Sequence, residues 1–239
     1  MNMKAVNEEW FQHPFNGPYI NTSYKNNRLG VAHWRSYMEA TGGGFNKGGI
    51  AGPFVLPAGM ELWKLSAYKV GGPKAKVSEW WCAKNPFKEQ THGLRRSLEE
   101  AALNGVPLNV YARIASCVKI EWNTLDTLQI IKLNKPVKAL WGKFAPMNLH
   151  DIKNPKYWTD KNDARLKQMQ QSGYDPALGD AVLGGLGAYQ LFIPGMIGED
   201  VTVVGYANAN EQNYSEIKRL LGINSLPSGP NDLGWSRSK

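Results

Sequence analysis

Short β-prone segments lie on both sides of a helical stretch, and this order constrains the possible fold more than any other feature. The first are residues 53–65, which turn at Pro57-Ala58-Gly59, and residues 77–82 (VSEWWC). After the helical stretch come residues 128–133, 137–144, 189–193 and 201–206. Strands, then helices, then strands favour an α+β fold over a doubly wound sheet, in which the two would alternate.

The helical stretch is marked by apolar residues at helical spacing. Residues 94–104 show this period and end at Gly105. Residues 108–124 continue it, so they predict a second helix that packs as core scaffolding, with Trp122 on its apolar side. Shorter helices are expected at residues 31–40, 163–171 and 215–221.

A glycine-rich turn, residues 184–187, leads directly into the β-prone run at 189–193. Glycines reach backbone conformations closed to other residues and let a ligand approach the main chain. Tyr189 and Gln190 would place a flat ring and a hydrogen-bonding head at this strand entry. The alternative is a plain hairpin entry with Gln190 solvated. A second glycine-rich segment, 42–52, lacks GxGxxG or GxxxxGK[ST] spacing and is interpreted as a linker.

The composition is that of a globular protein with a full core, because 239 residues contain 42% hydrophobic and 20% charged residues. The net charge of +8 favours contact with an anion such as a nucleotide, a nucleic acid or an acidic protein. The 28 Lys and Arg are scattered along the chain, so no nucleic-acid groove is indicated.

Cys82 and Cys117 lie in no CxxC pattern, which argues against zinc, and we expect two buried thiols rather than a disulfide. The four histidines are spread out and indicate packing or surface roles. GxSxG and HExxH motifs are absent, and Glu79 is the acid best placed on an expected strand, with a solvent-facing role as the alternative. The chain starts without an apolar signal region and has no run of about 18 apolar residues.

Four segments resemble the ADP-ribosyltransferase-like fold of NAD-consuming bacterial toxins: LPAGMELWKL, VSEWWC, LQIIKLNKPVKALWGKFAP and GGLGAYQLFIPG. They are similar in particular to necrotizing-toxin type NAD glycohydrolases and related effector domains of contact-dependent secretion systems. That group has an LP-G-x-x-L strand with a basic residue, a V-x-x-G-x-x-A-P strand and a GG-G-x-Q strand start. The resemblance covers residues 53–205 and implies a split β-sheet core with flanking helices.

The resemblance also implies roles for individual residues. Lys64 stands at the position that contacts the NAD phosphates, where this fold usually has arginine; lysine offers a point charge instead of a two-pronged fork. Ser78 matches the serine that packs under the nicotinamide ribose, and Gln190 matches the terminal catalytic position. Transferases of this fold usually carry glutamate there, whereas the glycohydrolase branch can carry glutamine.

Aromatic residues complete the expected site. Trp80 and Trp81 would stack on the nicotinamide or its ribose, with core packing as the alternative role for one of them, and Tyr189 would contact the substrate. Cleavage of the nicotinamide–ribose bond passes through an oxocarbenium-like state, which dipoles beside the ribose stabilise without a metal or a covalent nucleophile. A carboxylate would be the better base for activating a protein acceptor, so Gln190 favours hydrolysis over transfer.

We therefore expect an aromatic-rich arm and linker (1–52), an ADP-ribosyltransferase-like catalytic domain (53–210) and a C-terminal helix with a flexible tail (211–239). The expected function is that of an antibacterial-type effector that cleaves NAD(P)+. It would be secreted without a signal peptide, act in the target-cell cytoplasm without a membrane partner, and be neutralised by an acidic immunity protein.

Three alternatives stay open. The first is an ADP-ribosyltransferase that modifies protein or RNA. The second is a non-enzymatic binding or structural module whose Trp and Tyr residues mark an interaction surface. The third is an RNA-directed toxin, which the charge permits but which no metal-binding carboxylate cluster or histidine pair supports.

Overall fold

A computed structural model describes most of the chain. The described residues are 4–11, 45, 51–90, 92–120, 122–148, 160–171, 182–183 and 188–227. The helix expected at 31–40, the glycine-rich turn 184–187 and the tail beyond residue 227 lie outside them.

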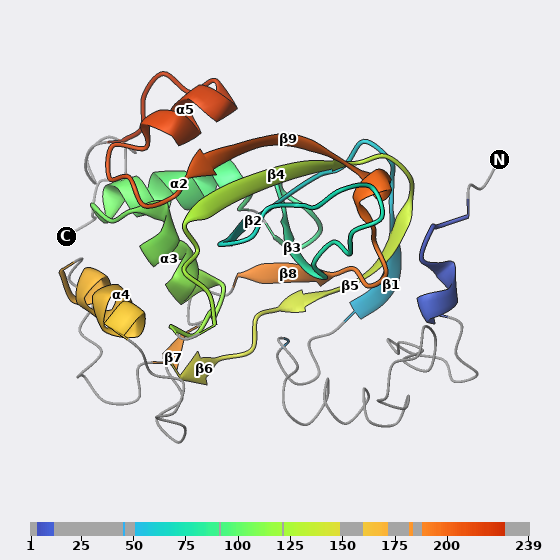
Figure 1. Ribbon diagram of the computed structural model, residues 1–239, viewed down its shortest axis with the longest axis horizontal. Helices are drawn as coiled ribbons and strands as arrows, with labels where there is room; N and C mark the ends of the chain where they lie inside the picture. Colours follow the sequence, from blue (N-terminus) through green and yellow to red (C-terminus); the bar gives the residue numbers. More distant parts are fainter. Residues whose placement is uncertain are drawn as a thin grey trace, which may run out of the picture.

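Seven strands form one antiparallel sheet in the order β1-β5-β8-β3-β2-β4-β9 (Figure 1). Two further strands, β6 and β7, pair with each other. The bounds are β1 Ala51–Leu56, β2 Glu61–Ser66, β3 Trp80–Ala83, β4 Thr127–Leu133, β5 Val137–Lys143, β6 Met147–Asn148, β7 Val182–Leu183, β8 Tyr189–Phe192 and β9 Val201–Asn208.

Four α-helices accompany the sheet in the described residues, so the mixed α+β class expected from the sequence is confirmed. They are α2 (Leu94–Leu103), α3 (Leu108–Ala115), α4 (Asp160–Gln171) and α5 (Ser215–Leu221), with short 3-10 helices η1 (Glu8–Phe11) and η4 (Gly198–Asp200). Helices α2 and α3 lie beside the curled sheet, and α5 lies next to β9 (Figure 1). Within the described residues, no helix is long and apolar enough to span a membrane.

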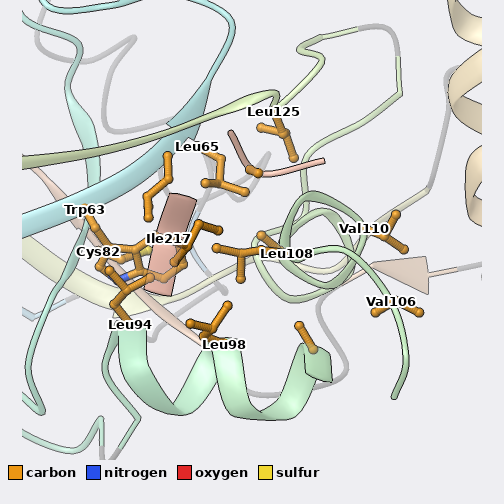
Figure 2. Packing of buried hydrophobic residues seen from close by; sticks show 14 of the residues in the cluster. Trp63, Leu65, Cys82, Leu94, Leu98, Val106, Leu108, Val110, Leu125 and Ile217 are labelled. Atoms are coloured by element: carbon orange, nitrogen blue, oxygen red, sulfur yellow. The ribbon is translucent and has the colours of Figure 1, made fainter. Parts of the chain in front are cut away.

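Side chains alternate along each strand, so a strand in the middle of the sheet can contribute to a core on each face. On β2, Leu62 belongs to the core on one face, whereas the next residue, Trp63, belongs to the core under the helices. The apolar stripe of α2 explains the second core: Leu94 and Leu98 point from the helix toward Trp63 and Cys82 (Figure 2). The helices are thereby fixed to the sheet directly beside β3.

Strand β3 connects two halves of the sheet. Its first residues, Trp80 and Trp81, pair with β8, whereas its last residues, Cys82 and Ala83, pair with β2. Strands β2 and β3 therefore separate beyond their last pair, and Lys64 continues along β2 in pairing with β4. We call this place, where Lys64 and Trp81 face a gap between the two strands, the fork.

The long helix expected at 108–124 is wrong, because α3 ends at Ala115. Cys117 has φ 53° and Leu125 has φ 61°, backbone conformations that no α-helix contains. The apolar period continues past the helix, but the side chains are held in a loop, and Trp122 is 56% exposed instead of packed in the core.

Two strand expectations also need correction. The strand expected at 77–82 begins only at Trp80, because Val77 donates its backbone hydrogen bond to Met196 outside the sheet. Strand β1 precedes the turn at 57–59, whereas the strand was expected only after that turn. It contains Pro53, which is tolerated because β1 lies at an edge of the sheet and its register shifts between Ala51 and Phe54.

The described part of the N-terminal arm is fastened to the sheet. The Asn7 side chain is fully buried; it donates to the carbonyls of Lys138 and Pro194, both at 2.8 Å, and accepts from the Lys138 amide at 2.7 Å. Trp10 and Phe11 pack against a small core around Phe192. The arm is thus part of the folded unit at these residues.

Candidate functional site

A cavity of about 280 Å³ lies at the fork, between the sheet and the end of α3. Four of the six residues expected in the site line it: Lys64, Trp80, Trp81 and Gln190. They come from β2, β3 and β8, so the fold brings together residues that are more than a hundred positions apart in the chain. The remaining two, Ser78 and Tyr189, lie beside the cavity.

Lys64 is half-buried at the fork and connects both of its sides. Its Nζ donates to Ser78 Oγ at 2.5 Å and lies 5.3 Å from the centroid of the Trp81 ring. Burial lowers the pKa of Lys64 to about 8, although the charge of Glu79 and the thiol of Cys82 act in the opposite direction. Ser78 therefore belongs to the site through Lys64, as a hydroxyl that holds the ammonium in place.

Gln190 is buried, with only 3% of its surface exposed, and its side chain lines the cavity. The alternative of a solvated carboxamide is therefore wrong. Gln190 lies on the same face of β8 as Phe192, and the position opposite it on β5 is Gly142. That neighbour has no side chain that could pack against the carboxamide.

The two tryptophans have different environments. Trp81 is 2% exposed and belongs to the same core as Leu62, on the other face of the sheet from the core under the helices. Its Nε1 donates to the Ser78 carbonyl at 2.6 Å. Trp80 is half-buried, with its ring 4.6 Å from that of Phe192 and 5.2 Å from that of Phe45. Both line the cavity, Trp81 as a fixed core wall and Trp80 as the more accessible ring.

Tyr189 faces a neighbouring pocket of about 190 Å³ instead of this cavity. Its ring stacks on Trp141, with centroids 5.0 Å apart and an angle of 14° between the planes. Glu89 also lines that pocket, and its pKa is lowered by a hydrogen bond from Trp141 Nε1. The two hollows share wall residues, including Trp63 and Cys82, so Tyr189 is close to the cavity without lining it.

Cys82 lies in the wall between the two hollows and was not expected in the site. Burial raises the pKa of its thiol to about 12, and the charge of Lys64 and a hydrogen bond with Ser116 only partly oppose this. The thiol is therefore neutral near pH 7, and a neutral thiol is a poor nucleophile. Cys117 is also a buried free thiol, and burial raises its pKa to about 12.

Glu79 does not line the cavity but pairs with Lys76, its carboxylate 2.5 Å from the Lys76 ammonium. Trp122, by contrast, lines the cavity although its sequence period placed it in a core helix. The polar Asn123-Thr124 pair that follows it was the one available sign of a loop. In the part of the chain that the structure describes, no three His, Cys, Asp or Glu side chains are grouped to hold a metal ion.

Comparisons with protein-family models, curated proteins and solved structures gave no significant match. The resemblance to ADP-ribosyltransferase toxins therefore rests on the four quoted segments alone, and the function has to be argued from the cavity.

Proposed function

We propose that the cavity at the fork binds NAD(P)+ and that the protein hydrolyses its nicotinamide–ribose bond. The observation that supports this most directly is the shared cavity of Lys64 and Gln190. A cation and a buried carboxamide among the residues that line one aromatic hollow match a substrate that carries both phosphates and a flat ring. As an effector of this kind, the protein would act in the cytoplasm of a target cell and need an acidic immunity partner in its producer.

Lys64 supplies the anion-binding end of the proposal. Its ammonium is partly removed from water, which makes the charged form less favourable than in a free lysine. A phosphate beside Nζ would stabilise the charge, so the dinucleotide and the charged lysine favour each other. Ser78 Oγ, 2.5 Å from Nζ, keeps the ammonium directed at the fork.

The other end of the cavity suits the reacting ring. Trp80, the half-buried ring of the wall, offers an indole surface, which attracts a positively charged ring such as that of NAD+. The Gln190 carboxamide would direct its dipole at the ribose as positive charge develops there. Because nicotinamide leaves readily, dipolar stabilisation suffices without a strong general acid.

The nature of the remaining wall favours water as the acceptor. None of the described residues that line the cavity is a carboxylate, so a base that would activate a protein acceptor is lacking there. The Cys82 thiol is neutral, and Ser78 is engaged by Lys64. The separation of the sheet beside β3 is also consistent with the split sheet that the resemblance implies.

The direct test is release of nicotinamide from NAD+ by the purified protein with no acceptor added. Gln190→Ala should lower the turnover by about 10²–10³, as the loss of a transition-state contact does elsewhere. Asn109→Ala is the matched control, because Asn109 is a buried carboxamide on α3 that does not line the cavity. A folded Gln190→Ala protein with wild-type turnover would exclude Gln190 from catalysis.

Gln190→Glu gives the second arm of the test. It preserves the shape of the side chain and adds a base, so transfer of ADP-ribose to an added protein should rise relative to hydrolysis. If the wild type consumes no NAD+ either alone or with cell extract, the proposed activity is wrong and a binding module becomes the better explanation.

A further inference from the structure

The loop between α3 and β4 is held in one shape by a buried arginine. Arg113 is 3% exposed, and its Nη1 donates to the carbonyls of Val118 at 3.0 Å and Lys119 at 2.9 Å. Its Nη2 donates to the carbonyls of Asn123 at 2.7 Å and Thr124 at 3.3 Å. We call residues 117–120 and 122–125 the rim segment. Charge-assisted hydrogen bonds at four carbonyls fix it where no regular structure does.

The rim segment is also tied to the end of β2. Asn123 Oδ1 accepts hydrogen bonds from the backbone amides of Ala67 and Leu125, each at 2.9 Å. Leu125 itself is buried in the core under the helices. The segment is therefore anchored from both sides, and its side chains are presented to the cavity from a fixed backbone.

Trp122 stands on this fixed backbone with 56% of its surface exposed. Five large hydrophobic side chains are exposed in the described residues, and Trp122 is the one among them that lines the cavity at the fork. A half-exposed indole forgoes hydrophobic stabilisation that covering it would provide. The anchored loop keeps the ring exposed to water. A ligand bound in the cavity beside Trp122 would bury the ring and recover that stabilisation.

The charges beside Trp122 indicate what that ligand is. Lys119 Nζ, on the same segment, lies over one face of the Trp122 ring, 5.4 Å from its centroid, and Lys64 lines the same cavity as Trp122. An exposed indole in the wall of a cavity that also contains a lysine matches a nucleobase attached to phosphate, because bases stack on indoles and phosphates pair with lysine.

We infer that Trp122 is the stacking platform for the adenine base of the dinucleotide, whose phosphates lie at Lys64. The inference rests on the proposed function. It assigns the mouth of the cavity to the adenosine half of the substrate, while the inner wall with Gln190 takes the nicotinamide half.

The test uses ADP-ribose, which carries the adenine and both phosphates but no nicotinamide. Trp122→Ala should weaken ADP-ribose binding by about tenfold to a hundredfold in calorimetry, the usual effect of removing a base-stacking ring. Trp122→Phe, which keeps a flat ring, should stay within about threefold of the wild type. Tyr206→Ala is the matched control, since Tyr206 also has a lysine over its ring, at 4.9 Å, but does not line this cavity.

Steady-state kinetics with NAD+ and with nicotinamide mononucleotide test the role of Trp122 independently of the calorimetry. For NAD+, Trp122→Ala should raise KM and leave kcat unchanged. For nicotinamide mononucleotide, which has no adenine, Trp122→Ala should change neither constant.

Unchanged ADP-ribose affinity in Trp122→Ala would overturn the inference, as would an equal loss on both substrates, which would make Trp122 a structural part of the cavity. The proposed function fails separately: ADP-ribose binding that depends on Trp122, with no NAD+ cleavage by the wild type, would keep the nucleotide site and remove the hydrolase.

Discussion

Lys64 makes the proposed site sensitive to pH. Burial lowers its pKa to about 8, so the ammonium loses its proton as the pH rises through that value. We expect affinity for ADP-ribose to fall between about pH 7 and pH 9.5 in calorimetric titrations. Lys64→Arg should bind with little pH dependence, because the pKa of arginine lies above about 12.

The stability of the folded protein depends on pH in the direction opposite to ligand affinity. Between about pH 8 and the ordinary lysine pKa, the unfolded chain holds a proton at Lys64 that the folded protein has released. This residue's contribution to the free energy of unfolding therefore becomes more favourable as the pH rises, while ligand affinity falls. Identical affinity profiles for the wild type and Lys64→Arg would contradict the contact between Lys64 and a phosphate.

The two adjacent tryptophans should separate stability from binding. Trp81→Ala removes a ring that is 2% exposed, and we expect it to lower the free energy of unfolding by about 3–5 kcal/mol. Trp80→Ala should cost less, because Trp80 is half-buried, and should raise KM for NAD+. Urea unfolding and steady-state kinetics on both variants test this; equal destabilisation with unchanged KM for Trp80→Ala would remove Trp80 from the site.

Sequence patterns could indicate the inner residues of the site but not its mouth. Lys64, Trp80 and Gln190 stand in short segments whose residue types already suggested a ligand. Trp122 could not be found in this way, since its spacing from Val118 fits a helix as well as a loop. Its exposure depends on the loop that Arg113 holds by hydrogen bonds, and the spacing of apolar residues carries no information about those bonds.

At the level of elements, Arg113 donates four of the hydrogen bonds that hold the loop after α3. Arg113→Lys keeps the charge but loses the planar fork, so it cannot reach both pairs of carbonyls. Each buried group left unsatisfied costs about 1–3 kcal/mol, and we expect a total loss of about 3 kcal/mol or more in chemical denaturation. Weaker ADP-ribose binding should accompany it, because the rim segment would no longer fix Trp122.

The matched control for that variant is Arg95→Ala on α2. The Arg95 side chain is 71% exposed and pairs with Glu99 within the same helix. Such surface pairs contribute little, so a loss below about 1 kcal/mol is expected. If Arg113→Lys were equally mild, the loop would owe its shape to other contacts.

Periodicity predicted α2 and most strands because their burial patterns are regular. It failed at the end of α3 and at β1 for different reasons. The residues after α3 keep an apolar period while the backbone turns at Cys117. Strand β1 contains Pro53, which is acceptable because β1 lies at the sheet edge and its register shifts between Ala51 and Phe54.

For the whole molecule, the arm around Asn7 is expected to matter more than its position near the chain start suggests. Asn7→Ala removes three hydrogen bonds to Lys138 and Pro194 in a fully buried place. We expect a loss of about 1–3 kcal/mol, measured as a lower melting temperature. Asn104→Ala serves as the control, since its hydrogen bond to Glu100 is exposed and should be worth little.

The order of the strands in the sheet could not be predicted from the sequence. Patterns showed which segments are extended, but β2 lies between β3 and β4, and β8 lies between β5 and β3. Such pairings join segments far apart in the chain, and alternation along one strand does not name its partner. The α+β class follows from the element order, whereas the resemblance to toxin folds remains a proposal.

The short strand β3 has a mechanical consequence. Its backbone pairing joins the two half-sheets through two residues on each side, and we expect any movement of the halves relative to each other to occur at this connection. A ligand that contacts both Lys64 on β2 and Gln190 on β8 would link the two half-sheets across this connection. Amide hydrogen exchange should then slow in both half-sheets when ADP-ribose binds, even at residues far from the ligand.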